Sequence, residues 1–226
     1  AAAAGRCKIM AGTGANSTAE AIILTKHARS VGADCSLQVT PYYNKPTQEG
    51  IYRHFSTIAD TCDIPIVLYN VPGRTGVGIA AETVARLVKN RNVLGVKEAA
   101  GSVERVSEIL SLCDTSIMCG DDSLTVPMML LGAKGVISVA SNIIPAELKK
   151  MTDACASGDF MTAVAMHRKY WRLFKDLFVE SNPIPVKAAM AMLGMIEEEY
   201  RLPLCPLSDV NREKLRKTVS ECIRSV

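Results

Sequence analysis

Short apolar runs alternate with amphipathic stretches along the first 140 or so residues of the chain. Each run is continuous and bounded by Gly, Pro or polar residues, and several are β-branched. Such runs are typical of strands that a parallel sheet buries on both faces. The six runs that we predict as strands are Lys8–Ala11, Ser36–Thr40, Ile66–Asn70, Val93–Lys97, Ser116–Gly120 and Gly135–Ser138.

The stretches between the runs have helical periodicity. Ser17 and Glu20 form a capping-box pattern, and Ile51, Phe55 and Ile58 fall on one helical face. The helices predicted between strands are Ser17–Arg29, Gln48–Ala59, Ala80–Val88, Val103–Leu112 and Ser123–Leu131. After Gly135–Ser138 the pattern predicts helices only, at Pro145–Ala156, Met161–Phe178, Ile184–Leu193 and Asp209–Arg224.

Strict alternation of buried strands with helices predicts an α/β fold with parallel strands. The pattern alone leaves two architectures open, a doubly wound open sheet and a (β/α)₈ barrel. We expect the α/β part to occupy residues 1–144 and a C-terminal helical region to occupy residues 145–226. No low-complexity linker separates them.

Composition excludes several classes of protein. The net charge of +3 is spread along the chain without a Lys/Arg cluster, so we expect no nucleic-acid partner. No apolar run is long enough to cross a membrane, and the first residues lack a signal-peptide pattern. Eight cysteines without a CxxC pair favour reduced thiols in a cytoplasmic protein, and three scattered histidines predict no metal site.

Candidate chemistry lies where the predicted strands end, because parallel α/β folds place their active sites there. Lys97 ends the run Val93–Lys97, where partial desolvation would lower its pKa and allow it to attack a carbonyl. Tyr69 could transfer protons, and Arg74 could bind a carboxylate. Each also has an ordinary explanation: an ion pair of Lys97 with Glu98, strand packing for Tyr69 and a solvated loop for Arg74.

Two further positions act as contrasts. Gly12-Thr13-Gly14 resembles the beginning of a phosphate-binding loop, but it lacks the complete GxGxxG pattern and a matching acidic residue. We interpret these glycines as a turn into the capped helix and keep a phosphate-binding protein as a minor alternative. Lys134 precedes a strand, so we expect it at the opposite, structural end of the sheet.

Several short motifs in one order resemble the dihydrodipicolinate synthase and N-acetylneuraminate lyase family. Their similarity to the family extends from about Ile9 to the C-terminus. They are Ala11-Gly12-Thr13-Gly14-Ala15-Asn16, Thr40-Pro41-Tyr42-Tyr43-Asn44, Tyr69-Asn70-Val71-Pro72-Gly73-Arg74-Thr75-Gly76, Gly95-Val96-Lys97-Glu98-Ala99, Gly120-Asp121-Asp122, Gly135-Val136-Ile137-Ser138 and Asn182-Pro183-Ile184-Pro185-Val186-Lys187. The resemblance implies a TIM (β/α)₈ barrel followed by helices, and a homo-oligomer.

The resemblance also implies chemistry. Lys97 would form a Schiff base with pyruvate without any other cofactor, and Tyr69 would transfer protons. Tyr43 would complete a relay that reaches the neighbouring subunit's site, and Arg74 would bind the carboxylate of the aldehyde partner.

The resemblance implies two further groups of residues. Gly120 and Ile137 would line the substrate pocket. Asn16, Glu20 and Tyr42 match positions that form a lysine feedback site in some members of the family.

Arg74, in an Arg-Thr-Gly sequence, favours the synthase branch of the family. That branch condenses pyruvate with L-aspartate semialdehyde in lysine (diaminopimelate) biosynthesis. The alternatives are another pyruvate-dependent aldolase, acting on a keto-deoxy sugar acid or N-acetylneuraminate, and a catalytically inactive homologue.

The family normally begins 60–70 residues earlier, with two strands and a Gly-Thr-Thr-Gly-Glu loop that binds the pyruvate carboxylate. We therefore expect a barrel truncated to about six strands. We also expect little or no synthase turnover from this stretch alone, with Lys97 still in place.

Overall fold

The computed structural model describes residues 3–223, which pack as two compact units. Unit 1 consists of Ala1–Gly120 with Leu131–Gly135, and unit 2 consists of Asp121–Leu130 with Val136–Val226. This division follows packing rather than the change from strands to helices, so the boundary expected at residue 144 stays a prediction. Arg224, the predicted end of the last helix, lies outside the described residues.

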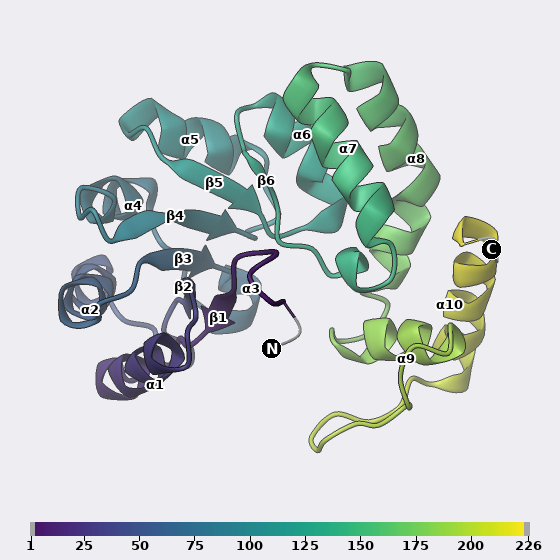
Figure 1. The fold of residues 1–226 in the computed structure, drawn as a ribbon, viewed down its shortest axis with the longest axis horizontal. Coiled ribbons are helices and arrows are strands. Elements are labelled where there is room, and N and C mark those ends of the chain that lie inside the picture. Colours follow the sequence, from purple (N-terminus) through teal and green to yellow (C-terminus); the bar gives the residue numbers. More distant parts are fainter. Residues whose placement is uncertain (1–2, 224–226) are drawn as a thin grey trace. The chain divides into compact units, whose positions relative to one another are not determined.

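All six predicted strands form, and they are β1 (Met10–Gly12), β2 (Cys35–Val39), β3 (Ile66–Asn70), β4 (Val93–Glu98), β5 (Ser116–Cys119) and β6 (Gly135–Val136). The sheet order is β1-β2-β3-β4-β5-β6, and the pairs from β1 to β5 are parallel (Figure 1). A doubly wound sheet reverses its order at a switch point, whereas a barrel keeps consecutive strands adjacent. The observed order therefore resolves the open choice in favour of the barrel type, as six strands of a (β/α)₈ barrel.

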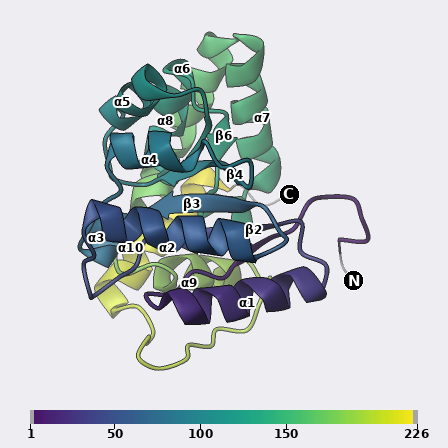
Figure 2. The same cartoon turned by 90° about the vertical axis from the view of Figure 1, so that its left-hand side faces the viewer.

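The four longest helices of unit 1 lie in one layer beside the strands, and Figure 2 shows them stacked in chain order. They are α1 (Thr18–Ser30), α2 (Gln48–Thr61), α4 (Ala81–Leu87) and α5 (Glu104–Leu112). The predicted cap of α1 is confirmed, because the Ser17 side chain accepts a hydrogen bond from the Glu20 amide. The helix faces and the strands bury a shared apolar core that includes Ile51, Phe55, Leu68 and Ile109.

Unit 2 contains α6 (Thr125–Leu130), α7 (Pro145–Ser157), α8 (Phe160–Asp176), α9 (Ile184–Met192) and α10 (Asp209–Cys222), with short 3₁₀ turns at Asp122–Leu124 and Ala140–Asn142. Its apolar core includes Leu148, Met151 and Phe174. The buried carboxylate of Asp176 joins α8 to α10, because it accepts from the Thr218 hydroxyl at 2.6 Å and from Lys214 Nζ at 2.9 Å. The helices predicted after Pro145 are thus confirmed over the described residues.

The glycine-rich turn after β1 has a packing role. Thr13 is buried, and its hydroxyl lies 2.9 Å from the Thr25 hydroxyl and within hydrogen-bond distance of Gln38 Nε2. A Cβ atom on Gly14 would lie 2.4 Å from the backbone nitrogen of Val39, so only glycine allows this approach of the turn to β2. These contacts support our interpretation of Gly12-Thr13-Gly14 as a turn.

Burial makes one histidine of unit 1 sensitive to pH. His54 is buried on α2, its Nδ1 lies 2.9 Å from the Thr18 hydroxyl, and its Nε2 has no hydrogen-bond partner within the described chain. Desolvation lowers the pKa of His54 from 6.5 to about 4. Between these values the unfolded state binds the extra proton, so stability rises with pH through this window and is lost as pH falls.

We predict that His54 removes about 2 kcal/mol from the free energy of unfolding between pH 7 and pH 5. Urea unfolding of wild type and His54→Asn at both pH values measures this difference, because asparagine keeps a hydrogen-bonding group near Thr18 but does not titrate. The variant should lose less stability than wild type on acidification. Equal losses would contradict the account of His54.

Candidate active site

The register between β3 and β4 brings the predicted catalytic residues together. Tyr69 pairs with Lys97, and Asn70 pairs with Glu98, at the carboxyl ends of the two strands. Successive side chains of a strand point to opposite faces. Tyr69 and Lys97 therefore share one face of the sheet, and Asn70 and Glu98 share the other.

Lys97 lies directly over the ring of Tyr69. Its Nζ is 4.0 Å from the ring centroid, and both side chains are half-buried. An ammonium group is attracted to the face of an aromatic ring, so this contact fixes the end of a flexible side chain. The structure thus brings the two residues chosen from the sequence together at adjacent strand ends, and their catalytic roles stay predictions.

Gly120 follows β5 and leaves room for the lysine side chain. A Cβ atom at this position would lie 2.5 Å from Ala99 Cβ and 3.1 Å from Lys97 Cε. Any larger residue would therefore push against both the backbone turn after β4 and the lysine. The sequence predicted Gly120 as a lining residue, and its geometry shows the steric reason for a glycine.

Arg74 sits in a short helical turn that the sequence did not predict, α3 (Pro72–Thr75), directly after β3. The turn ends at Gly76, whose φ of 77° is the left-handed conformation that glycine adopts at low cost. Arg74 is exposed, as a group that meets a substrate at the rim would be. Its role in carboxylate binding stays a prediction.

The Tyr42–Lys45 segment after β2 has a strained backbone. Tyr43 has a φ of 71°, and its side chain is 89% exposed on this chain. Positive φ in a bulky residue is uncommon and concentrates at functional sites. Tyr43 therefore projects from the surface, which is where a group that reaches another subunit would have to be.

The residues proposed for lysine binding are only partly joined by contacts. The Asn16 side-chain amide donates to the Tyr42 carbonyl at 3.2 Å, which links the turn after β1 to the segment after β2. Glu20 is exposed in the first turn of α1.

Ile137, the other predicted pocket-lining residue, belongs to unit 2, where it is half-buried directly after β6.

Sequence reasoning missed the polar network on the second face of β3 and β4. The buried Glu98 carboxylate accepts from Asn70 Nδ2 at 2.9 Å to each oxygen, from the Ala100 amide at 2.9 Å and from Arg105 Nε at 3.4 Å. The signal was present, because Asn70 and Glu98 are polar residues at the ends of strands that are otherwise apolar. The ordinary explanation of Lys97 had assigned Glu98 to the lysine, whereas Glu98 pairs with Arg105.

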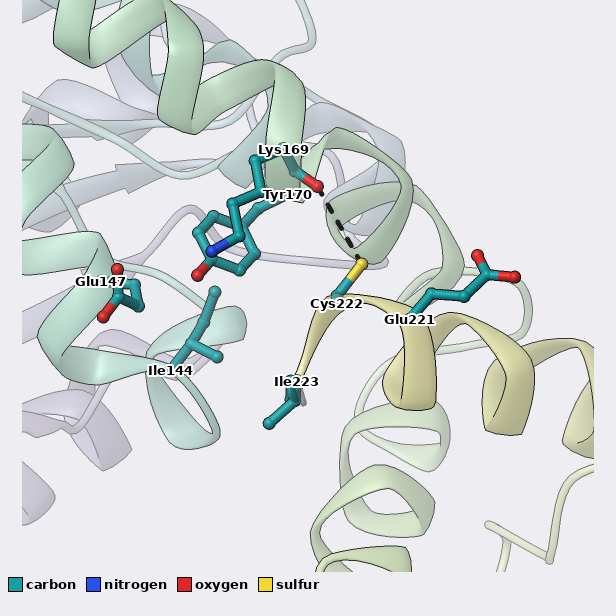
Figure 3. A pocket seen from close by; sticks show the side chains of 7 residues that line it. All are labelled: Ile144, Glu147, Lys169, Tyr170, Glu221, Cys222 and Ile223. Carbon is teal, nitrogen blue, oxygen red and sulfur yellow. Dashed lines mark hydrogen bonds between the residues drawn. The ribbon is translucent and has the colours of Figure 1, made fainter. Parts of the chain in front are cut away.

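Unit 2 contains a separate hollow of about 530 Å³, which Figure 3 shows. Glu147 of α7, Lys169 and Tyr170 of α8 and Cys222 of α10 line it with mixed charge. The Tyr170 hydroxyl raises the pKa of Lys169 by hydrogen bonding. None of the residues singled out from the sequence lines this hollow.

The part of the chain from residue 3 to residue 223 has no group of three or more His, Cys, Asp or Glu side chains placed to hold a metal ion. None of its helices combines the length and apolar character that crossing a bilayer requires.

Comparison with known proteins agrees with this geometry. The model of the dihydrodipicolinate synthetase family matches residues 1–222. A 4-hydroxy-tetrahydrodipicolinate synthase of Sulfurihydrogenibium sp. (strain YO3AOP1) is 58% identical over 218 residues, which are 95% of this chain and 74% of the relative.

Solved structures of dihydrodipicolinate synthases also superpose on this chain. The crystal structure of dihydrodipicolinate synthase from Aquifex aeolicus superposes with a TM-score of 0.95 at 52% identity, over 96% of this chain and 75% of that one. The chloride-inhibited enzyme from Acinetobacter baumannii, complexed with pyruvate, gives a TM-score of 0.95 at 46% identity, over 97% and 76%.

Six strands in chain order, with parallel pairs from β1 to β5 and a lysine at the end of β4, define a protein of the α/β-barrel type. The chain belongs to the dihydrodipicolinate synthetase family.

We predict that Gly120→Ala lowers the rate of imine formation at Lys97 at least about tenfold, because the added methyl group displaces the lysine or the turn at Ala99. Gly12→Ala is the matched control, since a Cβ there meets no atom within 4 Å. Borohydride trapping with pyruvate over time, read by intact mass, measures both. Equal trapping rates in the two variants would contradict the steric role of Gly120.

Proposed function

We propose that the site of this chain is built for the condensation of pyruvate with L-aspartate semialdehyde through a Schiff base on Lys97, as in a 4-hydroxy-tetrahydrodipicolinate synthase. The expectation of little or no turnover from residues 1–226 alone stays part of this proposal. The observation that carries the proposal is the position of Lys97 over Tyr69, at the ends of adjacent parallel strands. The relative from Sulfurihydrogenibium has this activity in its name, and the Acinetobacter baumannii relative holds pyruvate. The product would enter lysine biosynthesis.

The reaction follows from the chemistry of an amine and a ketone. Neutral Lys97 Nζ attacks the keto carbon of pyruvate, and water leaves to give an imine. Loss of a methyl proton gives an enamine, whose carbon attacks the aldehyde. The amine of the substrate then displaces Lys97 from the imine carbon, which closes the ring of the product and restores the free lysine.

Tyr69 and Arg74 take the remaining tasks in this proposal. Tyr69 lies against the lysine, so its hydroxyl can exchange protons with groups bound there. Arg74 binds the carboxylate of the aldehyde partner, which an exposed guanidinium on the loop after β3 is able to do. Gly120 and Ile137 line the pocket.

We also propose an assembly and a location. The exposed, positive-φ Tyr43 supports a homo-oligomer in which this tyrosine completes the relay of a neighbouring subunit. Asn16, Glu20 and Tyr42 are kept as the proposed lysine site, supported by the Asn16–Tyr42 hydrogen bond. All eight cysteines are free thiols, which supports a cytoplasmic location.

The central test is reduction of the imine. We predict that pyruvate and borohydride add one reduced pyruvyl group to the chain, and that peptide mapping places it on Lys97. Trapping requires only the imine, so it reports on the lysine independently of aldol turnover. Lys97→Arg should abolish the adduct.

Lys134→Arg is the control for the lysine. Lys134 is exposed and precedes β6, at the opposite end of the sheet from Lys97, so its replacement should leave the adduct intact. Labelling of another lysine in the wild type would refute the assignment.

Substitution of Arg74 tests the choice of aldehyde. We predict that Arg74→Leu raises the KM for aspartate semialdehyde at least about tenfold, because a charged hydrogen-bonding partner of the carboxylate is lost. The pyruvate adduct on Lys97 should form as in wild type. A coupled condensation assay measures the KM, with Arg91→Leu as control, because Arg91 is exposed and lies two residues before β4. Unchanged KM would favour a different pyruvate-dependent aldolase.

A further inference from the structure

The buried Glu98 carboxylate is surrounded by hydrogen-bond donors. Its two oxygens accept from the Asn70 side-chain amide, from the Ala100 backbone amide and from Arg105 Nε. Burial raises the pKa of Glu98, and the donors from Asn70, Arg105 and Ala100 oppose that effect. Burying a charge here costs free energy that an apolar side chain would avoid, so stability alone does not account for Glu98.

The partners of Glu98 reach the end of the loop that carries Arg74. Asn70 Oδ1 accepts from the Ile79 amide at 3.0 Å, and Arg105 Nη2 donates to the Ile79 carbonyl at 2.8 Å. Both backbone groups of Ile79 are therefore bound by side chains that also bind Glu98. The loop leaves β3 after Asn70 and ends at Ile79, so the network holds its two ends together.

A second side chain completes the attachment from α2. Gln48 Nε2 donates to the Gly78 carbonyl at 2.8 Å, and its Oε1 accepts from the Ala80 amide at 2.9 Å. Four consecutive backbone groups, from the Gly78 carbonyl to the Ala80 amide, are thus bound by side chains from three different elements. Such pairing at the end of a loop that contains three glycines restricts its conformation.

We propose that Glu98 is a positioning residue of the synthase site: through Asn70 and Arg105 it fixes the 71–79 loop, and with it Arg74, relative to Lys97. The inference rests on the proposed function for the roles of Lys97 and Arg74. Glu98 itself touches neither substrate. Because Lys97 and Glu98 are consecutive in β4, any shift of the strand would move the nucleophile and the loop attachment together.

The Glu98 network requires an acceptor at position 98 and a donor at position 70. Glu98→Gln keeps the shape of the side chain but replaces one acceptor oxygen with an NH₂ donor, which then faces other donors. The substitution should therefore weaken the attachment of the loop. Asn70→Asp places two carboxylates within about 3 Å of each other, a distance at which both cannot stay charged without penalty. The double variant N70D/E98Q exchanges the donor and the acceptor, so it restores the pair between positions 70 and 98. The new NH₂ group still faces a donor, either the Ala100 amide or Arg105, so we expect a partial recovery.

The test combines amide exchange with kinetics. We predict that hydrogen exchange in residues 71–80 accelerates about tenfold or more in Glu98→Gln and in Asn70→Asp, as loss of a buried hydrogen bond implies. The KM for aspartate semialdehyde should rise about tenfold in the same variants, whereas the pyruvate adduct on Lys97 forms within about threefold of the wild-type rate. Exchange and KM should return toward wild type in N70D/E98Q.

Control variants separate this role from general stability. Arg105→Lys cannot reach both Glu98 and the Ile79 carbonyl, so it should release the same loop even where Glu98→Gln fails to fold. Arg86→Lys changes an arginine that binds Glu49 and Tyr52 instead, and loop exchange should stay at the wild-type level.

The outcomes distinguish the two proposals. Wild-type exchange at residues 71–80 in Glu98→Gln and Arg105→Lys would overturn the positioning role, whatever the activity. Faster exchange that N70D/E98Q does not reverse even in part would also overturn it. A third outcome is faster amide exchange in the single variants that N70D/E98Q reverses, together with no pyruvate adduct in wild type. That outcome would support the loop attachment but contradict the synthase function.

Discussion

The parallel pairing of β3 with β4, whose register is constant from Val67 to Asn70, is the constraint on which the site depends. It places Tyr69 beside Lys97 on one face and Asn70 beside Glu98 on the other. A slip of one residue would exchange the two faces and bury the nucleophile among the helices. Reactive groups and supporting groups are therefore consecutive in the sequence but separated by the sheet.

Glycines let the neighbouring strands β4 and β5 approach closely. A Cβ on Gly95 would lie 2.1 Å from the Ser116 carbonyl oxygen, so a side chain there would separate β4 from β5. Gly120 leaves space for Lys97 in the same way at the end of β5. The Gly95-Val96-Lys97 sequence thus combines a steric requirement, a buried core residue and the nucleophile within three positions.

Much of this arrangement could be predicted from the sequence, because it depends on local periodicity. The six strands form where apolar runs indicated, and their ends hold Lys97 and Tyr69 as neighbours. Relationships that span many residues could not be predicted in the same way. The contacts of Arg105 with Glu98 and with Ile79 depend on how α5 packs, and no short motif encodes them.

Hydrophobic periodicity also did not predict the short irregular elements. The four-residue turn α3 lacks the length to show a period, and only Pro72 and Gly76 at its ends indicate it. The exposure of Tyr43 follows from a positive φ that Asn or Gly would adopt more readily, so the sequence predicts a packed tyrosine as easily as a projecting one. Strain of this kind is visible only in the folded chain.

The central claim is that Lys97 of β4 lies on the same face of the sheet as Tyr69. The adjacent Glu98, on the opposite face, fixes the 71–79 loop through Asn70 and Arg105. A crystal structure of the chain after reduction with pyruvate tests it most directly. The account predicts density that continues from Lys97 Nζ to the former keto carbon, on the same face as Tyr69, with Glu98 still bound to Asn70 and Arg105. An adduct on another lysine, or Lys97 turned to the Glu98 face, would contradict it.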